Sequence, residues 1–455
     1  MKHANKSTFG RIDQTRGARF LDVADSIGRQ LVRDAIWADR RCSWLIWTKE
    51  PVGGAFCSIH KAASLDLYQG VAGIALFLAH LVAATRDPHQ RQTLSGAARQ
   101  LDYQLAQSQP ASFGLYAGSI GAACALAAIG RAVGDESWER KGLVAADRVA
   151  AAAAAEHQFD LTSGCAGAII ALVRAAREFE QPGLIEHAQR FAAVLLAGVE
   201  RNELGMSWPA RAGETRNLLG LSHGTAGIAL ALLELHQVRP DPRYIEAALG
   251  AIDYERRLFD PAQNNWPDFR TLPGVAQAQP GFPIAWCHGS TGIGLARLRM
   301  LDLLPADQRL LVEIDAALGN AVRALNAPVT PVTADFSLCH GTCGNSEFLL
   351  QLGQRLGRPD AIAAAQRAGD LGIELFHTAN MPWACGVPDC GETACLMTGT
   401  AGIGMHYLRL FDPAAAPCVL LGDLTPPRRA AAEPLHSGKE PNRRFIGSHH
   451  HGTQS

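Results

Sequence analysis

The sequence lacks an excess of charge of either sign. Its 455 residues include 42 Lys and Arg against 43 Asp and Glu, which leaves a net charge of −1. Proteins that attract nucleic acids or anionic membranes by bulk charge carry a clear basic excess. We therefore expect no nucleic acid among the partners of this chain.

Segments that would direct the chain into a membrane are also missing. The first twenty residues, MKHANKSTFGRIDQTRGARF, contain no apolar core of a signal peptide. An uncharged stretch over 103–130 is interrupted by Pro110 and several glycines, so it predicts a loop entering a buried helix. No integral membrane segment is expected.

The dense cysteine spacing of a secreted disulfide framework is absent as well. The 11 cysteines are odd in number and scattered along the chain. Such a pattern favours a reducing, cytoplasmic location, where thiols stay free for metal binding or for chemistry.

The sequence does contain a sevenfold repeat. Gly-x-x-Gly pairs, each followed by an apolar helical run, recur at intervals of 46 to 65 residues. More polar, amphipathic segments lie between them, so each repeat is predicted to be a pair of helices with the apolar one inside. The pairs stand at positions 70/73, 118/121, 164/167, 224/227, 289/292, 341/344 and 399/402.

These helix pairs predict an all-α fold, a closed α/α toroid. An open solenoid would need terminal repeats with a polar face, whereas the first and last glycine-pair helices are as apolar as the central ones. The glycines suit chain turns that need positive φ or a close backbone approach. We expect N-terminal lead-in helices over 1–60, including an amphipathic helix over 18–48, then the toroid over 61–412 and a partly disordered tail over 413–455.

Two Cys-His-Gly triplets, at 287–289 and 339–341, point to a metal. Thiolate and imidazole are ligands that zinc prefers. When the repeats are aligned on their first glycine, the triplets and His223 fall at equivalent places, and a closed toroid would bring such places together at one mouth. The two residues before each first glycine are Tyr68-Gln69, Tyr116-Ala117, Thr162-Ser163, Ser222-His223, Cys287-His288, Cys339-His340 and Met397-Thr398.

Zinc held by Cys287, Cys339 and one histidine would keep a fourth position open, as in catalytic zinc sites. A second, closed site could be built from the remaining C-terminal cysteines, although their spacing matches no standard zinc pattern. These are Cys343, Cys385, Cys390 and Cys395.

Several motifs in order resemble the lanthionine synthetase C-like cyclases, and most closely the cyclase domain of class II lanthipeptide synthetases. The likeness covers roughly residues 20–421. It rests on SHGTAGIALAL, WCHG, LCHG with its following GN, and LMTGTAGIG, together with YERRLFDPAQNNWPDFR at 254–270 and PCVLLGDL at 417–424.

The resemblance implies a toroid of seven inner and seven outer helices that closes thioether rings. A zinc-activated cysteine thiol of a peptide would add across dehydroalanine or dehydrobutyrine to give lanthionine or methyllanthionine. By position, Cys287, Cys339 and His340 would be the zinc ligands, and His223 and Asp160 the catalytic histidine and aspartate. His288 occupies the place of a tyrosine found in stand-alone members and would be a further catalytic residue.

One departure and one alternative concern individual residues. The arginine that some members carry four residues before the first zinc cysteine is Pro283 here, which leaves Arg270 as a candidate cation. Asp160, which precedes a glycine turn and a helix, could instead serve as a helix cap.

The expected substrate is a dehydrated precursor peptide, leader plus core. Because residues 1–60 have room for only one or two helices, we also expect a separate dehydratase as a partner. Alternative functions are the addition of glutathione or another thiol to dehydroamino acids, or a zinc-bearing toroid that binds a peptide or thiol without catalysis. A prenyltransferase would need a basic pocket for a diphosphate, and the sequence contains no basic cluster that could form one. A glycosidase would need two carboxylates across a cleft, and only Asp66, Asp160 and Glu347 lie near the glycine motifs.

Overall fold

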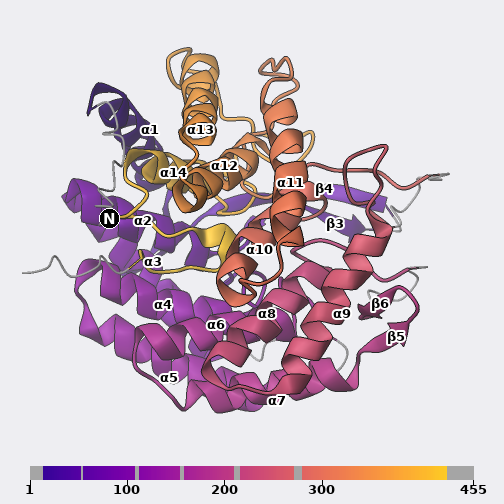
Figure 1. Cartoon of the computed structure of the whole chain (residues 1–455). Helices are drawn as coiled ribbons and strands as arrows, with labels where there is room; N and C mark the ends of the chain where they lie inside the picture. Colours follow the sequence, from indigo (N-terminus) through magenta and orange to yellow (C-terminus); the bar gives the residue numbers. More distant parts are fainter. Residues whose placement is uncertain are drawn as a thin grey trace, which may run out of the picture.

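The computed structural model describes residues 14–52, 55–107, 112–153, 158–209, 216–270 and 279–427. Within these segments helices form two concentric layers, an α/α toroid (Figure 1). The inner layer consists of α2 (Val71–Thr85), α4 (Ser119–Val133), α6 (Cys165–Glu178), α8 (Thr225–Val238), α10 (Ser290–Leu303), α12 (Thr342–Leu356) and α14 (Thr400–Phe411). The outer layer consists of α1 (Gln14–Asp34), α3 (Pro88–Gln107), α5 (Glu136–Ala152), α7 (Leu184–Ala197), α9 (Pro242–Leu258), α11 (Arg309–Leu325) and α13 (Pro359–Gly372), which continues into η1 (Ile373–His377).

The predicted division into apolar inner and amphipathic outer helices is confirmed. In α2, every residue from Val71 to Val82 is buried, as expected for a helix enclosed on all sides. In α5, burial is confined to one stripe, and the helix begins with Asp135, whose side chain accepts hydrogen bonds from the backbone N–H groups of Ser137 and Trp138. The layers therefore follow directly from the pattern of apolar residues.

The glycine pairs are explained by close approach of the backbone. The second glycine of each pair lies in the first turn of an inner helix, where a Cβ atom would collide with the carbonyl oxygen of the residue six positions earlier. The separation would be 1.7 Å at Gly121 and 2.1 Å at Gly292. Of the seven glycines that stand first in their pairs, only Gly289 has a positive φ, at 86°.

Replacing Gly121 by alanine is therefore expected to destabilise the toroid. The new methyl group cannot be placed without moving the Leu115 carbonyl, and such overpacking typically costs about 1–3 kcal/mol. The free energy of unfolding, from urea denaturation, measures the loss. Gly183→Ala is the control, because that glycine has helical φ and ψ and no atom within 4 Å of a new Cβ; an equal loss in both variants would contradict the explanation.

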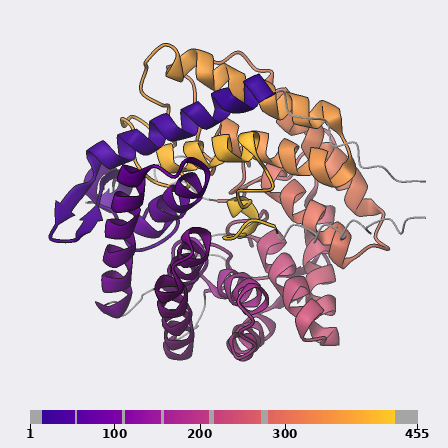
Figure 2. The same cartoon turned by 90° about the vertical axis from the view of Figure 1, so that its left-hand side faces the viewer.

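The toroid is closed by the N-terminal helix. Helix α14 packs against α2, and α1 lies along α14 as the outer helix of the seventh pair (Figure 2). The Phe20 and Tyr407 rings are 5.9 Å apart at this contact, and the Arg16 Nε donates to Asp370 on α13 at 3.0 Å. The expected lead-in helix is thus an integral part of the outer layer.

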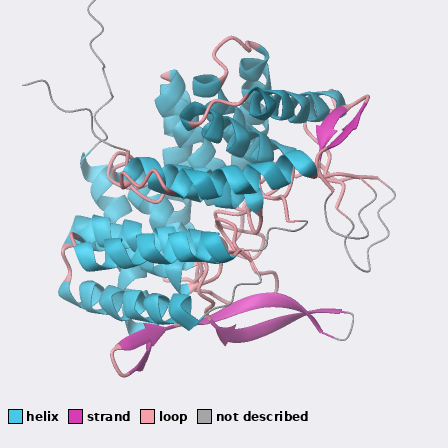
Figure 3. Ribbon diagram, turned by 90° about the horizontal axis from the view of Figure 1, so that it is seen from below, coloured by secondary structure: helices cyan, strands magenta, loops and turns pink. Residues whose placement is uncertain are grey.

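The helix predicted over 18–48 ends at Asp34, and the expectation of further helix up to residue 60 is wrong. Residues 36–62 form two antiparallel hairpins, β1 (Ile36–Ala38) with β2 (Arg41–Ser43) and β3 (Leu45–Val52) with β4 (Ala55–Ala62), at the periphery of the helices (Figure 3). Burial alternates strictly over 42–48, with Cys42, Trp44, Ile46 and Thr48 buried, and this period of two is that of a strand. A third hairpin joins β5 (Glu200–Asn202) to β6 (Gly205–Ser207).

The segment after α14 is a buried plug, and the expected tail from residue 413 is wrong as far as residue 424. Its short 3-10 helix η2 (Val419–Leu421) lies inside the ring of inner helices. Tyr116 Oη and Trp286 Nε1 donate to the carbonyls of Val419 and Leu420 at 2.6 and 2.9 Å. Residues 428–455, which include His449–His451, lie outside the described residues.

No helix in the described segments combines the length and apolarity required to cross a bilayer. The interrupted stretch at 103–130 contains the end of α3 and, after a loop, most of the buried helix α4. A loop entering a buried helix is what Pro110 and the glycines of this stretch predict.

Candidate metal centre and active site

Seven equivalent residues, one from each repeat, form a closed ring of backbone hydrogen bonds at one mouth of the toroid. Each is the residue two positions before the first glycine of its pair, and its N–H donates to the carbonyl of the corresponding residue in a neighbouring repeat at 2.8–3.3 Å. The alignment made from the sequence is thereby confirmed. In donor-to-acceptor order the ring runs Tyr68, Tyr116, Thr162, Ser222, Cys287, Cys339, Met397 and back to Tyr68.

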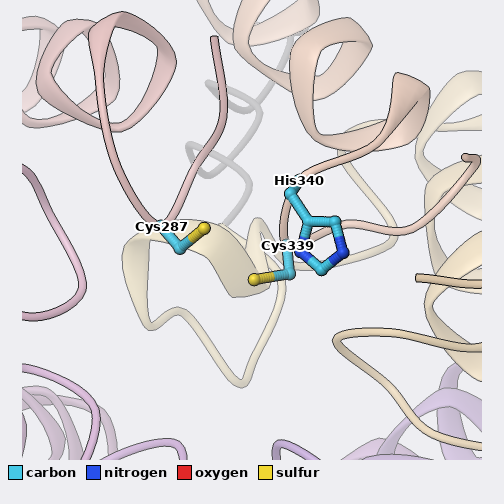
Figure 4. A group of neighbouring side chains, drawn as sticks. All are labelled: Cys287, Cys339 and His340. Carbon is cyan, nitrogen blue, oxygen red and sulfur yellow. The ribbon is translucent and has the colours of Figure 1, made fainter. Parts of the chain in front are cut away.

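This ring brings the candidate metal ligands together. Cys287 and Cys339 are neighbours in it, and His340 follows Cys339 in the chain. One ligand atom from each of the three residues lies within 4.8 Å of the others, and the two sulfurs point toward each other (Figure 4). Two thiols and an imidazole form a donor set suited to zinc. Among the described residues no other group of three meets this criterion, so the second site considered for the C-terminal cysteines is not supported.

His340 is oriented by groups outside the cluster. Its Nε2 donates to the Gly386 carbonyl at 3.0 Å and lies 3.3 Å from Asp335 Oδ2. A backbone carbonyl only accepts, so Nε2 carries the hydrogen and Nδ1 is left for a metal, the arrangement by which outer groups fix a ligating histidine. Burial disfavours charge on the ring, but the hydrogen bond to Cys287 and the nearby Asp335 outweigh it and raise the pKa of His340 to about 9.

The two thiols have opposite acidities. The hydrogen bond with Cys339, together with His340, holds the pKa of Cys287 well below its usual value despite burial. Burial and the adjacent Cys287 raise the pKa of Cys339 well above its usual value. A thiolate next to a cationic imidazole is a pair that gives up its remaining protons when a metal cation binds.

His223 and Asp160 form a second pair beside this cluster. The Asp160 carboxylate accepts from His223 Nδ1 through Oδ2 at 2.8 Å, and through Oδ1 it accepts from the backbone N–H groups of Ser163 and Gly164 at 2.6 and 3.1 Å. Burial opposes its charge, but the hydrogen bond from His223 outweighs it and lowers the pKa of Asp160. Asp160 therefore accepts from the turn and from His223 at once, so its place as a cap does not exclude a role beside the histidine.

His288 is buried between the two groups. Its ring stacks on that of His223 with centroids 5.6 Å apart, and its Nδ1 is 3.9 Å from Asp268 Oδ1. Its Nε2 has no hydrogen-bond partner among the described residues. Burial lowers the pKa of His288 to about 4, so the ring is neutral at physiological pH.

Arg270 supplies positive charge at this mouth. Its guanidinium makes a bidentate contact with Asp268, with Nη2 2.6 Å from Oδ2 and Nε 3.0 Å from Oδ1. Burial opposes the charge, but Asp268 and the thiols of Cys287 and Cys339 outweigh it and raise the pKa of Arg270. The candidate cation named from the sequence thus lies within electrostatic range of the metal cluster.

Three residues of the site were not assigned from the sequence. Asp268 and Asp335 precede their triplets by variable distances, so no fixed spacing identifies them. Tyr68 stands in the aligned ring position, and its hydroxyl donates to Cys339 Sγ at 2.9 Å. Its place in the alignment was the one signal that could have found it.

Comparisons with known proteins give a family and a fold. Residues 61–421 match the family described as lanthionine synthetase C-like protein. Among solved structures the fold is similar to nisin cyclase, with a TM-score of 0.61 at 15% identity over 88% of this chain and 96% of that one. A cellobiose 2-epimerase from Spirochaeta thermophila DSM 6192 gives a TM-score of 0.46 at 13% identity over 87% and 98% of the two chains.

At 15% identity the likeness to nisin cyclase shows the fold alone, and no curated protein matches the sequence. The family match, in contrast, spans most of the chain and includes the ring, both Cys-His-Gly triplets and His223. The chain belongs to the lanthionine synthetase C-like protein family.

Proposed function

We propose that this protein is a zinc-dependent peptide cyclase that forms lanthionine and methyllanthionine rings. The observation that carries the proposal is the convergence, on one hydrogen-bonded ring, of a two-thiol, one-imidazole cluster and a carboxylate-oriented histidine. The substrate is a precursor peptide, leader plus core, whose Ser or Thr residues a separate dehydratase has already converted. Addition consumes the dehydroamino acid, so dehydration has to come first.

Cys287, Cys339 and His340 are the residues that would hold the zinc. When bound, the metal would lower the pKa of a peptide thiol and keep it as a thiolate at neutral pH, although a free thiol has a pKa of about 8.5. All eleven cysteines lie in the described segments and are free thiols. This agrees with the reducing, cytoplasmic location that we propose.

The proton that completes the addition is supplied by a residue of the chain. As the sulfur bonds to the β-carbon of the dehydroamino acid, the alkene electrons move to the α-carbon and form an enolate, which then takes one proton. We assign this step to His223, since Asp160 accepts from Nδ1 and leaves Nε2 for the substrate. His288, neutral and buried, packs against His223 and fixes its ring plane.

Arg270 is proposed to stabilise the negative charge of the enolate. Arg270→Gln should keep zinc but slow cyclisation by about tenfold. This is less than the 10²–10³ lost with a dedicated oxyanion donor, because Asp268 already offsets part of the arginine charge. Steady-state rates measure the effect.

Arg216→Gln is the matched control for that variant. It also removes one positive charge, from a guanidinium 5.1 Å from the centroid of the Phe269 ring, next to Arg270 in the chain. Equal losses in the two variants would show a general charge effect and contradict the assignment to Arg270.

The function is tested with two forms of one Cys-containing peptide. The dehydrated form should lose free thiols without a change in mass, since an intramolecular addition conserves all atoms, and the unmodified form should lose no water. A mass gain equal to an added small thiol would instead identify a transferase that adds glutathione or another thiol. Binding of the dehydrated peptide without any loss of thiols would identify a non-catalytic toroid.

A glycosidase is disfavoured by the contacts of the available carboxylates. Asp160 is held by His223, and Asp66 is 2.6 Å from Ser64 Oγ. Glu347 is buried with Arg409 and His406. Each of these three carboxylates is already hydrogen-bonded or ion-paired, so none is free to form a catalytic pair with a second carboxylate across a cleft.

A further inference from the structure

The phenol of Tyr68 contacts a sulfur of the metal cluster directly. Its hydroxyl is 2.9 Å from Cys339 Sγ. The backbone of Tyr68 is fixed on both sides, because its N–H donates to the Tyr116 carbonyl and its own carbonyl accepts from Met397 N–H. The same closed set of backbone hydrogen bonds therefore fixes the backbone of both Tyr68 and Cys339.

Tyr116 shows what is specific to Tyr68. It is the equivalent residue of the next repeat and also a tyrosine, but its hydroxyl donates to the Val419 carbonyl in the plug at 2.6 Å. Tyr116 is fully buried, whereas Tyr68 is only half-buried. The two tyrosines occupy equivalent positions in neighbouring repeats but differ in what their hydroxyls bind, and only Tyr68 contacts the metal cluster.

A phenol with an ordinary pKa of about 10 is protonated at physiological pH and acts as a donor to a thiolate. Such a hydrogen bond withdraws electron density from the sulfur, so the sulfur becomes a weaker nucleophile and a weaker electron donor to a metal. Hydrogen bonds from outer groups are known to orient ligands and tune metals in this way.

We propose that Tyr68 is a positioning residue for Cys339. Its hydroxyl holds the ligating sulfur in place and lowers its nucleophilicity, so that the peptide thiolate, which lacks this donor, is the sulfur that reacts. The proposal rests on the zinc site and the cyclase function proposed above. It adds a residue that discriminates between two thiolates in the same site.

Cobalt(II)-substituted protein provides a readout apart from activity. Thiolate-to-cobalt charge-transfer bands report the energy of the sulfur lone pairs. Tyr68→Phe removes the hydroxyl and keeps the ring, so the band should move to longer wavelength as the Cys339 lone pair rises in energy. Tyr116→Phe removes a hydroxyl from the equivalent position without touching sulfur, and its band should stay where it is in the unaltered protein.

Alkylation adds a chemical test of the same hydrogen bond. In zinc-loaded Tyr68→Phe, Cys339 should react with iodoacetamide about two- to tenfold faster than in the unaltered protein, the range set by the loss of one hydrogen bond. Peptide mapping locates the modified cysteine.

An unchanged cobalt band in Tyr68→Phe, or the same shift in Tyr116→Phe, would overturn the role of Tyr68 while leaving the metal site intact. An absence of thiolate charge-transfer bands in the unaltered protein would overturn the metal site itself, and the role of Tyr68 with it.

Discussion

Cys339→Ala is expected to abolish stoichiometric zinc binding and, with it, all measurable cyclisation. The substitution removes one of the three proposed ligands, and two remaining protein ligands are fewer than the three that hold zinc in catalytic sites. The fold should persist, because the core of the toroid is built from apolar helices and Cys339 contributes one small buried side chain. Zinc per chain from elemental analysis and helix content from circular dichroism measure the two effects.

Cys343→Ala is the matched control for that experiment. Cys343 is also 2% exposed and lies shortly after Cys339, in the first turn of α12, but it does not belong to the metal cluster. This variant should retain one zinc per chain. Full zinc occupancy in Cys339→Ala would contradict the ligand assignment.

The architecture and the position of the site could be predicted because both follow from the repeat. An apolar helix after each glycine pair defines the inner layer. Because the repeats close into a ring, equivalent residues lie at the same level along the axis of the toroid. Aligning seven glycines therefore placed Cys287 beside Cys339 before any distance was known. The ring of backbone hydrogen bonds is the physical form of that alignment.

Other features depend on contacts that no repeat encodes. The C-terminal plug is bound by Tyr116 and Trp286, which lie 303 and 134 residues before their partners in it, so its composition alone resembles that of a tail. The hairpins depend on packing that the apolar pattern does not show. Residues 42–48 read CSWLIWT, in which Leu45 and Trp47 are as apolar as the buried Trp44 and Ile46, so the alternating burial is not visible in the sequence. Asp268 contributes to the site from a loop with no counterpart in the other repeats.

His223→Asn is the second variant with a large expected effect, and it separates proton transfer from metal binding. His223 is outside the metal cluster, so zinc should remain at one ion per chain. The loss of the proposed general acid should lower the cyclisation rate by roughly 10²–10⁴-fold. Loss of zinc in this variant would instead place His223 among the ligands.

Asp160→Asn tests how His223 is oriented, and Asp66→Asn is its control. Both aspartates stand four residues before the first glycine of a pair and accept a turn N–H through Oδ1, but only Asp160 also contacts a histidine. An asparagine can still cap the turn, while its amide no longer fixes Nδ1 of His223 as the protonated nitrogen. Asp160→Asn should therefore slow cyclisation substantially, though less than His223→Asn, and Asp66→Asn should leave the rate nearly unchanged. Equal rate losses in the two aspartate variants would mean that the carboxylate acts through the turn and not through His223.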